Sequence, residues 1–144
     1  MHSLAILYPI FALAFWTCLV LLQIPIARFR AGARREIRIN DFKYGESASV
    51  PPHVSIPNRN YMNLLEVPVL FYVVCLLSFV TGGASPVMLV VAWAYVALRM
   101  LHSLIHLSYN NVMHRLAAFA SSNLLLIALW VLAAMQMLAN APQA

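Results

Sequence analysis

The chain has 144 residues, of which 63% are hydrophobic and only 9% are charged. Soluble domains carry about 25% charged and about 45–50% apolar residues. A domain of this size has too much surface to bury such an apolar excess, which excludes a soluble or disordered chain. The basic balance, with a sequence pI of about 9.7, therefore does not indicate a nucleic-acid partner. We predict an integral membrane protein with a single domain, residues 1–144.

Four stretches are apolar enough to cross the membrane, which takes about 20 residues of helix for about 30 Å of hydrocarbon. They cover residues 4–27, 61–80, 86–107 and 116–138. An uncharged turn around Gly82 separates the second from the third, and Asn110-Asn111 marks the turn before the last. The sequence thus predicts an all-α bundle of four transmembrane helices, of which the last three are joined by tight turns.

The first apolar stretch raises the alternative of a cleaved signal peptide. A signal peptide carries positive charge before a short apolar core. Here the arginines follow the apolar residues, beginning at Arg28, and the apolar stretch is longer than a signal core. We therefore expect the first stretch to remain as a membrane helix.

The distribution of basic residues predicts the orientation in the membrane. Seven of the nine Lys and Arg residues lie in the loop 28–60, and Arg115 begins the last span on the same side. Because basic residues accumulate in cytoplasmic loops, this loop is expected in the cytoplasm and both termini on the opposite side. Such a loop also favours contact with anionic lipid.

The loop 28–60 has two parts of different character. Its first part, residues 28–43, has residues that tolerate helix and could extend the first span out of the bilayer. Its later part, residues 47–57, contains three prolines, which we expect to prevent a helix there.

The two cysteines and the common catalytic motifs give little indication of function. Cys18 and Cys75 each lie inside a predicted span, where isolated thiols usually serve as small packing residues. The sequence contains no glycine-rich phosphate loop, metalloprotease motif or nucleophile elbow. Nucleotide chemistry is therefore not indicated.

Two charges inside the spans are the first sign of a functional site. Glu66 and Arg99 lie within the second and third spans, where a charge costs about 2.5–3.5 kcal/mol. Such residues normally face the bundle interior and have a partner. Glu66 shares a helix face with Arg59 and Asn63. Arg99 likewise shares a face with the two histidines His102 and His106.

Glu66 and Arg99 are expected at similar depth, since each lies about 10 Å from the cytoplasmic end of its span at 1.5 Å per residue. They can therefore pair, within a chain or between chains. The other polar residues near this end predict a net positive pocket: Arg59, Asn63, His102, His106 and Arg115. Its ligand should be small, zwitterionic and net anionic, with an apolar second substrate reaching it from the lipid.

The first group of these residues carries a family resemblance. Arg59-x-x-x-Asn63-x-x-Glu66, followed by Pro68, resembles the second-helix motif of the MAPEG family, the membrane-associated proteins in eicosanoid and glutathione metabolism. The number of spans, the chain length and the predicted topology are similar to those of that family as well. The resemblance covers essentially the whole chain.

The second group resembles a particular branch of that family. Arg99-x-x-His102-Ser103-x-x-His106, followed by Arg115, is similar to the third-helix region and following turn of the microsomal glutathione transferases. Where the glutathione-conjugating members have a tyrosine, this chain has His106. Tyr109 lies close by in the sequence.

The resemblance implies a homotrimer that binds glutathione between subunits near the cytoplasmic face. It implies that Arg59, Asn63 and Glu66 hold the glutathione backbone and termini, with His106 also at the site. It further implies that Arg115 stabilises the thiolate, and that Arg28 or Arg30 adds a carboxylate contact. A nearby cation lowers the pKa of a thiol, and a thiolate attacks lipophilic electrophiles or lipid hydroperoxides.

Within this resemblance, Arg99, His102 and Tyr109 are interpreted as a supporting polar network. The implied function is a glutathione-dependent transferase or peroxidase, with glutathione as co-substrate and lipid and a lipophilic small molecule as partners. Such a protein would lie in a bacterial inner membrane or an endomembrane. Catalytic activity itself stays open, because some family members bind lipophiles without catalysis.

Two alternatives remain beside an enzyme. One is a non-catalytic lipophile-binding or scaffold protein of the same fold. The other is a haem or metal protein, which His102 and His106 at i, i+4 would permit. Axial haem ligation needs histidines on facing helices, whereas these two lie on one helix, so we expect no metal.

Overall fold

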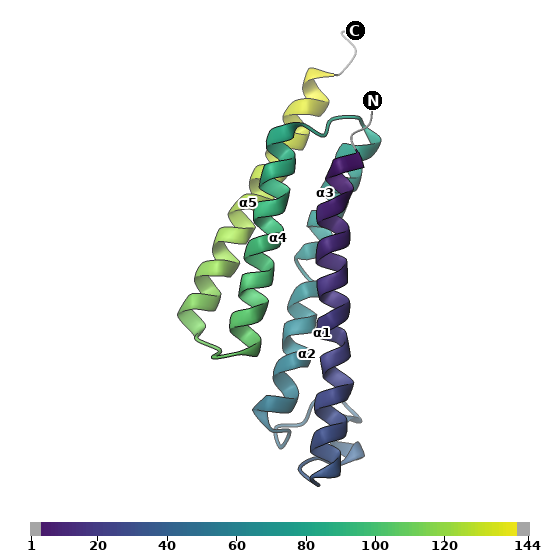
Figure 1. Cartoon of the computed structure of the whole chain (residues 1–144), viewed down its shortest axis with the longest axis vertical. Coiled ribbons are helices and arrows are strands. Elements are labelled where there is room, and N and C mark those ends of the chain that lie inside the picture. Colours follow the sequence, from purple (N-terminus) through teal and green to yellow (C-terminus); the bar gives the residue numbers. More distant parts are fainter. Residues whose placement is uncertain (1–3, 141–144) are drawn as a thin grey trace.

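The computed structural model describes residues 4–140 and is all-helical, as Figure 1 shows. Its elements are η1 Leu4–Ile6, α1 Leu7–Ala33, η2 Ile39–Phe42, α2 Pro52–Leu65, α3 Pro68–Val80, α4 Pro86–Leu107 and α5 Val112–Ala139. The first and last described residues lie at the same end of the bundle (Figure 1). The α1–α2 connection lies at the opposite end and extends beyond the α4–α5 turn (Figure 1).

Four helical segments are long and apolar enough to cross a membrane, which confirms the predicted all-α four-span architecture. They are Leu4–Ala33, Pro52–Val80, Pro86–Leu107 and Val112–Ala139. The third segment has the predicted bounds. The others extend beyond them, because the helices continue past the hydrocarbon-length stretches from which the sequence prediction was made.

The expected break at the three prolines is wrong for residues 52–57. Pro51 precedes α2 in an extended conformation, and Pro52 takes the first helical position, where the missing N–H costs nothing. Pro57 lies inside the helix and is buried against the rest of the bundle. Two prolines therefore begin α2, and the connection to α1 is shorter than the predicted loop 28–60.

Helix α1 ends at Ala33 and does not continue to residue 43. Arg35 has a positive φ of 59°, the left-handed conformation that commonly follows a helix end. The amide of Arg35 bonds the Gly32 carbonyl at 3.0 Å, and the amide of Glu36 bonds the Ala31 carbonyl at 3.0 Å. This pair of bonds is the Schellman arrangement, which satisfies the last carbonyls and turns the chain away.

The second membrane segment consists of two helices, with a break at Glu66 and Val67. Pro68 begins α3, and a proline has no N–H to give to the Leu64 carbonyl four residues earlier. The amides of Val69 and Leu70 instead make short turn bonds to Glu66 and Val67. The break lies at the level where the polar residues of α4 begin, and it shapes the candidate site.

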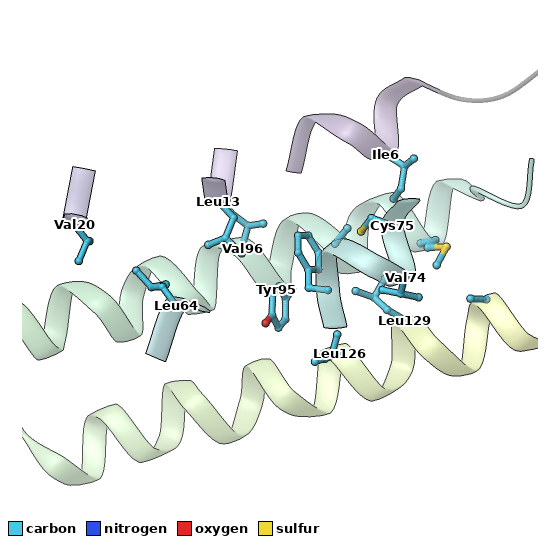
Figure 2. Packing of buried hydrophobic residues seen from close by; sticks show 14 residues of the cluster. Ile6, Leu13, Val20, Leu64, Val74, Cys75, Tyr95, Val96, Leu126 and Leu129 are labelled. Carbon is cyan, nitrogen blue, oxygen red and sulfur yellow. The ribbon is translucent and has the colours of Figure 1, made fainter. Parts of the chain in front are cut away.

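The main apolar cluster lies in the half of the bundle near the described termini. Figure 2 shows the side chains of this cluster gathered between the helices. Leu13 and Val20 of α1 lie seven residues apart, on one face, and are fully buried. Phe71 of α3 stacks on Tyr95 of α4 with ring centroids 4.5 Å apart. This core holds the four segments together. The other half of the bundle buries polar side chains and a second, smaller apolar cluster of Ala31, Val50 and Val54.

Candidate functional site

A pocket of ≈ 270 Å³ lies at the end of the bundle where α4 passes into α5. Its walls come from α2, α4 and α5: Asn63, His102, Val112, Arg115, Leu116 and Phe119. Three of these residues, Asn63, His102 and Arg115, belong to the polar pocket predicted from the sequence. The structure therefore brings residues from three separate helices around one small space.

The α4–α5 turn places Arg115 at this pocket. Asn110 has a positive φ of 50°, a conformation that asparagine tolerates well. The Asn111 side-chain oxygen accepts bonds from the amides of Met113 and His114, at 3.0 and 3.1 Å, and so caps α5. Arg115 then donates from Nη1 to Oδ1 of Asn110 at 2.7 Å. The guanidinium is held by the turn, and no carboxylate neutralises it among the ion pairs of residues 4–140.

His102 and His106 form the buried histidine pair of α4. Their side chains are 4% and 3% exposed, and their rings stack with centroids 6.2 Å apart. The Arg115 carbonyl lies 3.0 Å from Nδ1 of His102. Because a carbonyl only accepts, Nδ1 carries the hydrogen, and Nε2 of the neutral ring is an acceptor.

Several nitrogens around the histidine pair are buried and unused. Nε2 of His102, both ring nitrogens of His106 and Nε of Arg115 have no hydrogen-bond partner in residues 4–140. A buried polar atom without a partner costs about 1–3 kcal/mol. Such a concentration in one region is typical of a site that a polar ligand or ordered water completes.

Arg99 is fully buried one turn deeper than His102. It donates from Nη2 to the backbone carbonyl of Asn63, and its guanidinium lies 5.4 Å from the Phe119 ring centroid. Its Nε and Nη1 have no partner within the described chain. Arg99 thus stabilises the backbone where the second segment is broken before Pro68, a role the sequence did not suggest.

The pairing of Arg99 with Glu66 does not form within one chain. Glu66 is exposed at the end of α2 and takes part in none of the ion pairs between residues 4 and 140. The bend at Glu66 turns its side chain outward, whereas the prediction assumed a straight helix. Only the pairing between chains stays as a prediction.

Arg59 and Asn63 lie one turn apart on α2, as predicted, but they differ in exposure. Arg59 is exposed. Asn63 lines the pocket, and its side-chain amide donates to the Arg59 carbonyl at 3.1 Å. Neither Arg59 nor Glu66 lines the pocket, so the three-residue motif is only partly assembled by a single chain.

The structure distinguishes Arg28 from Arg30, which the sequence left as alternatives. Arg28 lies 3.2 Å from Glu46 and 4.4 Å from the centroid of the Phe42 ring, so it holds the loop against α1. Arg30 is exposed and borders a second pocket of ≈ 370 Å³ between α1 and α2. Arg30 is the arginine of the two that is free to contact a ligand.

Tyr109 lies apart from the histidine pair. It is 61% exposed, and its hydroxyl lies 3.0 Å from Nδ1 of His114. Both residues border an outer groove of ≈ 410 Å³ between α4 and α5. Within one chain, Tyr109 therefore does not take the place of a tyrosine at position 106.

A buried network that the sequence reading missed lies beside the site. Asn60 is fully buried and donates from Nδ2 to the Ser103 hydroxyl at 2.7 Å. The indole of Trp16 donates to the same hydroxyl at 2.9 Å. These bonds join α1, α2 and α4. The sequence prediction has Asn60 in the loop 28–60, because it lies just before the second apolar stretch.

The His, Cys, Asp and Glu side chains of the described residues are not arranged as a metal site. Within residues 4–140, no group of three or more His, Cys, Asp or Glu side chains lies together in a metal-binding arrangement. The cysteines Cys18 and Cys75 are both free.

The fold and this site define an integral membrane protein with four spans and, at one end of the bundle, a cationic pocket that His102 and Arg115 line and His106 does not. The family model of the MAPEG family matches residues 6–135, so the chain belongs to that family. No curated protein and no solved structure matches the chain. Membership supports a membrane role related to glutathione or eicosanoids in general terms.

Proposed function

We propose that the protein is a glutathione-dependent membrane transferase or peroxidase acting on lipophilic electrophiles or lipid hydroperoxides. One observation carries this proposal: buried nitrogens of His102, His106 and Arg115 have no partner within residues 4–140, and while His102 and Arg115 line one pocket, His106 stacks on His102. The site presents cations for carboxylates, amide groups for a peptide and an apolar border open to lipid. Glutathione has the matching charges and peptide bonds.

In the proposed reaction, Arg115 lies beside the glutathione sulfur. A fixed guanidinium in a site of low dielectric stabilises the thiolate and lowers the pKa of the thiol. His106, in the place of the family tyrosine, donates a ring N–H to the same sulfur. The structure leaves both groups with unused nitrogens, so neither has to break a bond within the chain in order to act.

The thiolate then reacts with a substrate dissolved in the bilayer. In conjugation, the sulfur forms a bond to an electrophilic carbon, and the leaving group departs with the bonding electrons or a proton is added. In peroxidase turnover, the sulfur takes the distal oxygen of a lipid hydroperoxide, giving an alcohol and a glutathione sulfenic acid. A second glutathione reduces the sulfenic acid and yields the disulfide and water.

We propose that the complete site forms between the subunits of a homotrimer. The exposed Arg59 and Glu66 lie outside the single-chain pocket, as expected if they meet a ligand at a subunit boundary. Arg30 would contribute from the neighbouring subunit. The basic end of the bundle would face the cytoplasm, with both termini on the other side, because six basic residues lie in the segment 28–46.

The decisive experiment is a titration of the purified, detergent-solubilised protein with glutathione. The thiolate is followed by its ultraviolet absorbance at neutral pH. We expect a saturable thiolate signal in the natural protein and its loss in Arg115→Ala, while Arg34→Ala behaves as the natural protein. Arg34 suits a matched control because its side chain is 71% exposed and lies in the loop.

A non-catalytic lipophile-binding protein is the second candidate function. The presence of His106 in place of the tyrosine favours it, since the family's conjugating members carry that phenol. This candidate predicts glutathione binding without a thiolate signal, or no glutathione binding at all. Saturable glutathione binding by calorimetry without a thiolate signal would therefore reject the transferase function and favour the non-catalytic lipophile-binding protein.

A further inference from the structure

A second site candidate lies at the far end of α1, away from the histidine pair. A groove of ≈ 460 Å³ runs between the last turns of α1 and the 3-10 helix η2. We refer to it as the α1–η2 groove. Its apolar lining includes Phe29, Gly32, Ile37, Ile39 and Phe42, and Arg28 and Arg38 complete it. The lining is thus largely apolar and carries charge of a single sign.

The length of α1 places this groove at the depth of the lipid headgroups. The helix has 27 residues, or about 40 Å at 1.5 Å per residue, whereas the hydrocarbon is about 30 Å thick. The first charged residue of α1 is Arg28. Phe29 and Ile39 nevertheless stay 78% and 93% exposed, as expected for apolar side chains that contact lipid and not water.

The charges around the groove leave an excess of cations. The segment 28–46 carries six basic and three acidic side chains. All three carboxylates have partners already: Glu46 pairs with Arg28, Glu36 with His53 and, at 3.9 Å, with Arg34, and Asp41 accepts from the Arg38 amide at 2.7 Å. The guanidinium of Arg38 takes part in no ion pair among residues 4–140. It is therefore free for an anion at the mouth of the groove.

We propose that the α1–η2 groove binds one anionic phospholipid of the surrounding membrane. Its phosphate meets Arg38, and one acyl chain lies against Phe29 and Ile39. Charge complementarity selects an anionic lipid over a zwitterionic one, whose own cation would meet the arginines. This inference does not rest on the proposed reaction, since the groove shares no lining residue with the pocket of His102 and Arg115.

The first test uses native mass spectrometry of the detergent-solubilised protein with added palmitoyl-oleoyl phosphatidylglycerol or phosphatidylcholine. We expect the anionic lipid to bind at least about fivefold more tightly, and Arg38→Gln to remove about that factor, as for one charge near a surface. Arg34→Gln removes the same charge outside the groove. It should weaken binding by less than about twofold.

The second test blocks the groove without changing its charge. An added Cβ at Gly32 meets no atom within 4 Å, so a larger side chain fits and extends into the open space. Gly32→Leu should abolish retention of phosphatidylglycerol, whereas Gly32→Ala should retain it. Circular dichroism and gel filtration verify the fold. If Gly32→Leu does not fold, the comparison of Arg38→Gln with Arg34→Gln still decides the matter.

Three results would overturn the proposal. Equal losses in Arg34→Gln and Arg38→Gln would indicate diffuse attraction to the whole basic segment. Displacement of the lipid by millimolar inorganic phosphate would assign the groove to a free anion. Displacement of the lipid by glutathione would make the α1–η2 groove part of the glutathione site. The lipid assignment would then fail, and the proposed function would stand.

Discussion

The two halves of α4 differ in what their buried faces contain. In the half near the described termini, the helix buries Met88, Ala92 and Tyr95 against the apolar core. In the other half it buries Arg99, His102 and His106. Among these six side chains, the first half leaves one polar atom without a partner, the Tyr95 hydroxyl, whereas the second half leaves five nitrogens without partners within residues 4–140. The difference indicates that stability is concentrated at one end of the bundle and ligand chemistry at the other.

The strongest test of this division is Phe71→Ala in the apolar half. Phe71 is fully buried and stacks on Tyr95, so we expect the free energy of unfolding to fall by about 3–5 kcal/mol. Val73 of the same helix, 45% exposed, provides the control, and Val73→Ala should cost far less. Unfolding in mixed micelles measures both. Equal costs would show that the core is not where the stability lies.

Arg115→Ala should have the largest effect in the polar half. Loss of a fixed cation beside the sulfur is expected to lower turnover, and with it the thiolate signal, by about 100-fold. The unfolding free energy should change little, because Arg115 lies at the pocket and not in the core cluster. Arg115→Lys keeps the charge and should recover part of the signal. A wild-type signal in Arg115→Ala would contradict the site.

Ser103→Ala examines the boundary between the two halves. It leaves the buried donors of Trp16 and Asn60 without their acceptor, which we expect to cost about 1–2 kcal/mol of stability. The glutathione affinity should change only slightly, because Ser103 does not line the pocket. Comparing unfolding with calorimetric binding separates the two effects. A large loss of binding without a loss of stability would place Ser103 in the site.

His106→Tyr should give the smallest effect, in the direction of a gain. A phenol restores the donor of the glutathione-conjugating members, and one hydrogen bond is worth about 0.5–1.5 kcal/mol. We therefore expect the conjugation rate to rise by about threefold, which corresponds to about 0.6 kcal/mol. His114→Tyr, on the exposed face of α5, serves as the control. An unchanged or lower rate would favour the non-catalytic candidate.

Much of the fold was predictable because hydrophobic length is a local property. Apolar stretches long enough to cross the bilayer can be counted without any tertiary information, and all four are helical. The errors lie at prolines, whose effect depends on position in the helix. Pro52 begins α2 without penalty, Pro57 is accommodated inside it, and Pro68 breaks the segment in the middle.

The candidate site was predictable as a set of residues but not as an arrangement. Asn63, His102 and Arg115 were expected together and line one pocket, because polar residues at one depth of a bundle tend to converge. The partner of Arg99 was not predictable. It depends on a carbonyl at the helix break, and a backbone acceptor leaves no trace in the sequence.

Residue order alone was enough to predict a membrane bundle with four spans whose polar residues gather at one end. These features follow from composition and helical spacing, which neighbouring residues set. The packed helices were needed to show that Arg99 donates to the Asn63 carbonyl at the helix break, that Arg28 pairs with Glu46, and that Arg30 lines a pocket between α1 and α2. Such choices depend on which groups from distant segments meet, and spacing along one helix does not contain that information.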